Sequence, residues 1–423
     1  MASQEILRGE PSRGSFINDP KVRSLFFQTL VIVVLFGSIW WIVENVIENL
    51  QRLHIASGFQ FLRGRAGFDI SDTPIAYTSD STYGRALIVG LLNTIIVAVA
   101  GIVIATIVGF VIGIGRLSQN WLIRKICTVY VEIFRNIPPL LVIFFWYSGV
   151  LAVLPPPRES IHLPFGSFLN QRGFYFPRTV WGDGSWLVGV ALLLAVAMAW
   201  FVAYRARQRQ MATGQQFPVF WTSVGLIVGL PLLAFLLSGM PLSFDFPKQS
   251  TFNLTGGFQI KPEFLSLLLA LSFYTAAFIA EIVRAGILSV DEGQTEAASA
   301  LGMTRMQTMR RIVLPQAMRV IIPPTGNETI SMLKTSSLAY EIAYVELLKS
   351  VANVYSVNFL QIPLLMVAVV WYLIATTVLY IGQYYLERHF ARGSVRALPL
   401  TPIERARRII LGSRHESGAG GIA

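Results

Sequence analysis

The sequence predicts an all-α membrane protein, a polytopic bundle of about eight transmembrane helices. Two properties of the composition and one of the pattern support this prediction. Apolar residues make up 54% of the 423 residues and charged residues only 13%, a charged share well below that of ordinary soluble domains. The apolar residues gather in runs long enough to cross a bilayer, and basic residues lie in the connectors between these runs.

The apolar runs define the predicted spans, because a helix that crosses the hydrocarbon core needs about 20 mostly apolar residues. The runs lie at 25–43, 86–115, 128–152, 186–204, 218–238, 264–287, 321–345 and 363–386. The run at 321–345 is the weakest, since it carries Glu328, Lys334 and Glu341. The first run follows a polar stretch unlike a cleavable signal peptide, so we expect it to remain as a membrane anchor.

Lys and Arg in the connectors orient the predicted helices, because cytoplasmic connectors carry an excess of both. With the N-terminus inside and the runs alternating, basic clusters such as Arg205, Arg207 and Arg209 fall on the inner side. Both termini are then expected in the cytoplasm. The long outer segments, expected to be surface loops with or without short interfacial helices, lie at 44–84, 153–185 and 239–262.

Small residues mark one face of the second run, where Gly101, Ala105, Gly109 and Gly113 recur every four positions. That spacing places them on one side of a helix, where small side chains let another helix approach closely. We expect this side to be a helix interface, either as ordinary bundle packing or as a seal along a pathway.

Several functional classes find no support in the sequence. In a soluble protein, a net charge of +11 would indicate binding to nucleic acid. Here the basic residues lie in the connectors between apolar runs, as membrane topology requires. The expected contact is therefore lipid and not nucleic acid. Neither a glycine-rich phosphate loop nor a catalytic triad or carboxylate pair is visible, so we expect no enzyme activity, no catalytic residue and no cofactor on this chain. No metal site is expected either, because the candidate ligands are scattered: Cys127, His54, His162, His389 and His415.

The polar segment 289–315 lies between two apolar runs and is expected at the cytoplasmic face. Ser289 and Glu292 have the spacing of a capping box, so a short helix can start there. Gly302 is suited to end that helix in a left-handed conformation. Pro315 is expected to end or redirect the chain.

A second short helix is expected within this segment, because Thr304 and Gln307 repeat the capping-box spacing. Met306, Met309 and Val313 then form an apolar face on it. Such a helix either docks into a groove of a partner or packs on lipid and on its own bundle, and the pattern alone leaves both interpretations open.

A family resemblance favours the first interpretation. The fixed positions and the spacing of the EAA loop of ABC importer permeases are matched by Glu296, Ala297, Ala298, Gly302, Ile312, Leu314 and Pro315. In that family the loop is the coupling helix, so the resemblance implies that these residues dock the ATPase. Flanking sequences, such as Lys334-Thr335-Ser336-Ser337-Leu338, resemble the polar amino-acid branch of the family. The insertion at 153–262 and the extended N-terminal region resemble the long permeases of alpha-proteobacterial general L-amino-acid importers.

The resemblance implies a type I ABC importer permease core with two inserted spans. Residues 1–85 would then hold a cytoplasmic segment, the first transmembrane helix and a periplasmic loop, 86–390 the permease domain, and 391–423 a basic cytoplasmic tail. It also implies a multi-pass protein of the bacterial inner membrane that passes L-amino acids from a periplasmic binding protein to the cytoplasm by alternating access. The implied partners are a cytoplasmic ABC ATPase dimer, which holds ATP and Mg, and a second permease, either a related chain or a second copy.

Polar residues inside the predicted spans are candidates to line the pathway, because ionisable groups in a membrane are costly. Tyr274, Glu281 and Arg284 share one helix face. The other candidates are Asn327, Ser331, Lys334, Thr335 and Glu341. An alternative stays open for both sets: Glu281 pairs with Arg284, and Lys334 reaches the membrane surface. Glu132 and Arg135 are expected to form an interfacial ion pair.

Other classes of membrane protein account for fewer features of the sequence. A secondary amino-acid transporter or channel without an ATPase would leave the 289–315 segment unexplained. A membrane-embedded enzyme would need a catalytic cluster, and a signalling subunit has no motif in its favour. The sequence does not specify which amino acids are carried.

Overall fold

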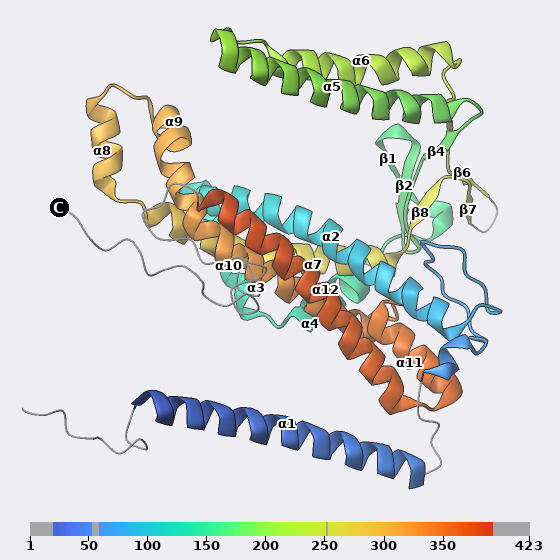
Figure 1. Cartoon of the computed structure of the whole chain (residues 1–423). Coiled ribbons are helices and arrows are strands. Elements are labelled where there is room, and N and C mark those ends of the chain that lie inside the picture. The colour runs from blue at the N-terminus through green and yellow to red at the C-terminus, as the bar shows by residue number, and fades with distance from the viewer. Residues whose placement is uncertain (1–19, 53–58, 251–252, 392–423) are drawn as a thin grey trace, which may run out of the picture.

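Helices form most of the part of the chain that the structure describes, and strands occur there only between Ile161 and Ile260 (Figure 1). The computed structural model describes residues 20–52, 59–250 and 253–391. Within these residues six helices are long and apolar enough to cross a membrane. They are α1 (Pro20–Arg52), α2 (Tyr83–Gly115), α5 (Ser185–Thr213), α6 (Val219–Leu237), α7 (Pro262–Leu288) and α12 (Gln361–Phe390). The polar N-terminal stretch and the basic tail predicted to be cytoplasmic lie outside the described residues.

The third predicted run is not one straight helix. It consists of α3 (Trp121–Asn136) and α4 (Pro139–Phe144), the latter followed by a π-helical segment at Phe145–Leu151. The chain bends by 112° between the two parts, and it adds a seventh span only if the bent pair counts as one. The bend follows from Pro138, because a residue before proline is driven out of the helical region, and Ile137 is extended with φ −99° and ψ 133°.

The seventh predicted run also differs from the expectation of one continuous span. Helix α10 covers Leu314–Thr335 and gives way to a 3₁₀ helix at Ser336–Ile342. Consecutive hydroxyl side chains bond back to the helix at this point, since Ser336 Oγ donates to the Leu333 carbonyl at 2.7 Å and Ser337 Oγ to that of Lys334 at 2.8 Å. Such back-bonding competes with the regular helix ladder. The described spans therefore number six or seven, and the expected eight included α10.

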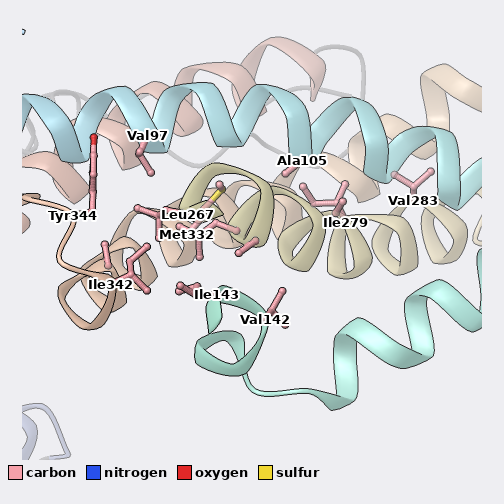
Figure 2. Packing of buried hydrophobic residues seen from close by; sticks show 14 of the residues in the cluster. Val97, Ala105, Val142, Ile143, Leu267, Ile279, Val283, Met332, Ile342 and Tyr344 are labelled. Carbon is pink, nitrogen blue, oxygen red and sulfur yellow. The ribbon is translucent and has the colours of Figure 1, made fainter. Parts of the chain in front are cut away.

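The core forms where α2 and α7 pack side by side (Figure 2). A Cβ placed on Gly109 would lie 2.7 Å from Ile279 Cβ, and one on Gly113 would lie 2.7 Å from the Ala280 carbonyl oxygen. The small-residue face of α2 is thus a helix interface, as predicted, because only a hydrogen at these positions allows the approach. Val142 of α4 and Met332 of α10 close the same apolar cluster from other sides.

A buried polar centre fastens α11 (Leu347–Asn358) to α2 and α12. Glu346 is fully buried and accepts hydrogen bonds from the Tyr372 hydroxyl at 2.6 Å and the Lys349 amide at 2.8 Å. Asn93 donates its amide to the Val345 carbonyl at 2.9 Å. A buried polar group is tolerated only when it is hydrogen-bonded in this way, so the centre fixes the angle at which α11 meets the bundle.

The insertion at 153–262 folds into a two-helix hairpin and three small antiparallel sheets. Helices α5 and α6 pack against each other and turn at Gly214, which has φ +72°. One sheet has the order β1-β2-β3-β8, and the others pair β4 with β5 and β6 with β7. The strands are β1 (Ile161–Leu163), β2 (Ser167–Asn170), β3 (Gly173–Phe176), β4 (Arg178–Trp181), β5 (Leu242–Asp245), β6 (Lys248–Gln249), β7 (Leu254–Thr255) and β8 (Phe258–Ile260). Two of the outer segments expected as loops, 153–185 and 239–262, therefore contain strands.

The connecting segments gather at two opposite ends of the molecule (Figure 1). The start of α1, the α5–α6 turn and the polar segment between α7 and α10 lie at one end of the molecule. The small sheets and α11 lie at the other end. This division separates the basic connectors from the long outer segments, in agreement with the arrangement that the basic residues predict.

Candidate functional site

The segment between α7 and α10 forms a projecting helical tip, made of α8 (Glu292–Ala300) and α9 (Arg305–Thr308). We call residues 291–308 the α8–α9 tip. The first helix starts where predicted, but its cap is Asp291, whose Oδ1 accepts the Gly293 amide at 2.7 Å. Ser289 was the expected cap; its hydroxyl instead donates to the Gly286 carbonyl at 2.8 Å, because Ser289 still belongs to the end of α7.

The turn inside the tip follows the sequence signals closely. Gly302 has φ +73°, and the amide of Met303 bonds back to the Ala298 carbonyl at 3.1 Å, which ends α8 in a left-handed cap. The Thr304 amide donates to Gln307 Oε1 at 2.9 Å, and the Gln307 amide donates to Thr304 Oγ1 at 3.4 Å. The second capping box is confirmed, and these paired bonds hold the two short helices in a fixed relation.

Pro315 was expected to end or redirect the chain, and the first of these two outcomes is wrong. Helix α9 continues through a π-helical turn at Met309–Val313 into α10, and Pro315 lies in the first turn of α10. Proline lacks the amide that would continue the helix ladder. A π-helical turn changes the pattern of backbone hydrogen bonds locally. The helical path from α9 to α10 therefore continues past the missing amide of Pro315.

Apolar side chains at the end of the tip are left uncovered. Leu301 is 80% exposed and Met306 is 75% exposed, while Ala298 is 1% exposed and faces inward. Glu296 and Ala297 are exposed as well. Exposed large apolar side chains on a rigid projection are typical of a protein interface.

The predicted apolar face of the second helix is divided between the bundle and the surface. Val313 is buried, Met309 is half-buried and Met306 is exposed. Ile312 and Leu314 are half-buried and Pro315 is exposed. The part near α10 therefore packs on the chain's own bundle, and the part at the tip is available to a partner.

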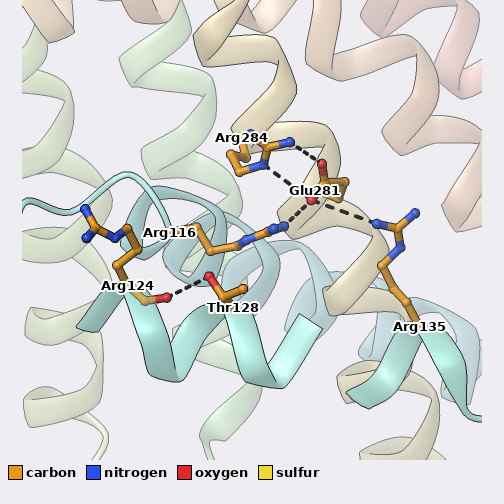
Figure 3. A network of polar contacts seen from close by, with 6 residues as sticks. All are labelled: Arg116, Arg124, Thr128, Arg135, Glu281 and Arg284. Atoms are coloured by element: carbon orange, nitrogen blue, oxygen red, sulfur yellow. Dashed lines mark hydrogen bonds and ion pairs between the residues drawn. The ribbon is translucent and has the colours of Figure 1, made fainter. Parts of the chain in front are cut away.

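An arginine–glutamate network lies on α7, towards the end of the bundle that bears the tip (Figure 3). Glu281 contacts Arg284 Nη2 at 2.5 Å and Arg135 Nη1 of α3 at 3.9 Å, and it also pairs with Arg116 at the end of α2. The side chains of Glu281 and Arg116 are 24% and 10% exposed. One carboxylate therefore holds the ends of three helices together.

The network settles one open alternative and corrects one prediction. Glu281 does pair with Arg284. The structure adds Arg116, whose pairing with Glu281 no local sequence pattern indicates because the two residues are 165 positions apart. The predicted pair of Glu132 with Arg135 is wrong, since Arg135 faces Glu281 and stacks its guanidinium 5.7 Å from the centre of the Phe278 ring.

The polar stripe on α10 is exposed in the single chain. Asn327, Ser331 and Lys334 face outward, whereas the opposite side of the helix packs on α7 and α12. Thr335 is half-buried and donates to the Ser331 carbonyl at 2.9 Å. Glu341 is exposed but lies on the 3₁₀ helix beyond α10, so it does not continue the stripe as predicted.

The two predicted stripes run past each other at similar depth. Gly286 of α7 packs against Ile321 of α10, and the two helices are antiparallel in the bundle. With equal rise per residue, Glu281 lies level with about residue 326 of α10 and Tyr274 with about residue 333. Among the described residues, no cluster of His, Cys, Asp or Glu is suited to hold a metal ion.

The fold and the exposed tip define a polytopic membrane protein with an apolar helical projection at one end of its bundle. Residues 208–392 match the family described as binding-protein-dependent transport system inner membrane component.

Similar proteins extend the match to most of the chain. It is 58% identical over 333 residues to the general L-amino acid transport system permease protein AapQ of Rhizobium johnstonii, covering 79% of this chain and 83% of that protein. It is 46% identical over 339 residues to the putative amino-acid ABC transporter permease protein YhdX of Escherichia coli, covering 80% and 86%. It is 37% identical over 377 residues to the glutamate/glutamine/aspartate/asparagine transport system permease protein BztB of Rhodobacter capsulatus, covering 81% and 88%.

This chain therefore belongs to the family of amino-acid ABC transporter permeases. The resemblance drawn from the 289–315 segment is confirmed. In this family the permease is a transport subunit and the ATPase is a separate subunit. Membership sets aside the alternatives of an enzyme and of a transporter that works without an ATPase.

Proposed function

We propose that this permease carries L-amino acids inward, and that the α8–α9 tip transmits the motion of an ATPase to the spans. The observation that carries the proposal is the exposure of Leu301 and Met306 on a tip that is otherwise held rigid by two caps. ATP and Mg belong on the partner ATPase dimer. Glu296, Ala297, Ala298, Gly302, Ile312, Leu314 and Pro315 form or support the docking surface.

The polar stripes of α7 and α10 are proposed to line the pathway, facing a second permease. An amino acid carries both an ammonium and a carboxylate, so a pathway needs weak acceptors and donors. Tyr274, Asn327, Ser331 and Lys334 supply both kinds of group. Tyr274 lies at about the depth of Lys334, and Ser331 and Asn327 continue the stripe along α10. Glu281 and Arg284 already satisfy each other, so their proposed part is to hold the helix ends while the pathway opens.

The proposed orientation places the tip, the start of α1 and the α5–α6 turn in the cytoplasm of a bacterial inner membrane. The small sheets then lie in the periplasm, where a binding protein delivers the amino acid. The shared end seen in Figure 1 supports this orientation, as does the excess of basic residues in the same connectors. The second permease is proposed to be a related chain.

Co-purification with the ATPase tests the docking proposal. We would compare the wild type with Leu301→Asp plus Met306→Asp after co-expression with the neighbouring transporter genes. The matched control is Met211→Asp, since Met211 is 86% exposed and lies in the last turn of α5, outside the tip. Loss of the ATPase from the tip variant alone supports docking, and full retention by that variant contradicts it.

A further inference from the structure

The α5–α6 hairpin lies beside the bundle, and very few of its residues are buried. No residue of α6 is buried, and α5 buries only Ala195, Ala199 and Ala206. The sequence from Ser185 to Leu237 contains no Asp or Glu. A helix that is apolar on all sides is typical of a membrane span, so we expect the surface of this hairpin to face lipid.

A hollow of about 200 Å³ lies at the end of this hairpin, next to the α5–α6 turn. Arg205 and Arg209 of α5 line it together with the rings of Phe201 and Phe217. The Arg205 guanidinium lies 5.2 Å from the centre of the Phe201 ring, and Arg209 Nη2 donates to Gln215 Oε1 at 3.3 Å. The hollow therefore combines two cationic groups with an aromatic wall.

These two arginines have no acidic partner among the residues that the structure describes. Elsewhere in the same end of the bundle, Arg116, Arg135 and Arg284 share Glu281. Within the described residues, the charges of Arg205 and Arg209 are thus not neutralised by an ion pair, and they lie beside the apolar wall of α5 and α6. Guanidinium groups bind phosphate through paired hydrogen bonds, and basic pockets beside membrane helices suit the headgroups of anionic lipids.

We propose that this hollow binds the phosphate headgroup of an anionic phospholipid, whose acyl chains lie along the apolar wall of α5 and α6. Arg205 and Arg209 hold the phosphate, and Phe201 and Phe217 cover the glycerol end of the chains. Basic residues that only set membrane topology must lie at this end of the hairpin, but they do not need a hollow around them. The hollow and the aromatic wall distinguish a binding site from that simpler role.

Lipid titration of the purified full-length chain in detergent tests the site. Phosphatidylglycerol and phosphatidylcholine would be added separately, and bound lipid would be counted by native mass spectrometry. The wild type is expected to prefer phosphatidylglycerol by about tenfold, and Arg205→Gln plus Arg209→Gln is expected to abolish that preference. The control, Arg124→Gln plus Lys125→Gln, removes the same charge from exposed positions of α3 and is expected to keep it.

Three results would overturn the proposal: no preference in the wild type, an equal loss in both double variants, or full displacement of the lipid by an equal concentration of inorganic phosphate. The last result would indicate a site for a free anion. If the double variant does not fold, the single variants Arg205→Gln and Arg209→Gln replace it. Each is expected to lower the preference by about threefold, and a single variant with the wild-type preference counts against the site.

Discussion

Removal of the Glu281 carboxylate should destabilise the bundle by a measurable amount. Glu281→Gln leaves Arg116, Arg135 and Arg284 facing one another without a counter-charge. Removing one partner from a buried ion pair costs about 3 to 5 kcal/mol. The side chains of Glu281, Arg135 and Arg284 are all more exposed than that of Arg116. Solvent screening at these positions lowers the expected cost to about 2 to 3 kcal/mol.

Thermal unfolding of the purified chain in detergent measures this cost. For a chain of this size, about 2 to 3 kcal/mol corresponds to a fall in Tm of roughly 3 °C. Arg116→Gln should act in the same direction, because it leaves the carboxylate with two partners instead of three. The double variant Glu281→Gln plus Arg116→Gln should lose less unfolding free energy than the two single variants lose together, because the two residues interact directly.

A wild-type Tm for Glu281→Gln, or strictly additive effects in the double variant, would refute this reasoning. Either result would mean that the network does not hold the ends of α2, α3 and α7 together.

Further predictions concern single positions. Gly109→Leu should lower the Tm by the equivalent of about 2 kcal/mol through overpacking against α7, whereas Gly189→Leu, with no atom within 4 Å of the added Cβ, should leave it unchanged. Glu346→Leu should cost about 2 kcal/mol by leaving the buried Tyr372 hydroxyl and Lys349 amide without an acceptor, and Glu346→Gln should cost less in the same unfolding assay. Thr304→Ala should speed hydrogen exchange in α9 by about fivefold, because loss of an N-cap costs about 1 kcal/mol; unchanged exchange would contradict the capping role.

Local signals predicted much of this fold. Four-residue spacing of small residues identified the α2 face that packs on α7, and Gly302 with the Thr304–Gln307 pair identified the turn of the tip. Each signal depends on residues a few positions apart, whose geometry the backbone itself fixes. The bend before α4 could have been found the same way, because Pro138 restricts Ile137.

Contacts between residues far apart in the sequence could not be predicted from local signals. Arg116 ends an apolar run, and nothing near it in the sequence indicates Glu281 as its partner. The strands of the insertion are only two to four residues long, too short for an alternating pattern to be recognised. The end of α10 at Thr335 depends on hydroxyl groups that bond back to the helix, which is a local effect hidden inside an apolar run.

Uptake by proteoliposomes tests the central claim most directly. The complete complex would be reconstituted with the binding protein and radiolabelled L-amino acids, comparing the wild type, Leu301→Asp plus Met306→Asp, and the Met211→Asp control. We expect uptake by the wild type and the control only when the ATPase side is supplied with ATP, and little uptake by the tip variant. Uptake driven by an ion gradient without ATP, or wild-type uptake by the tip variant, would contradict the account.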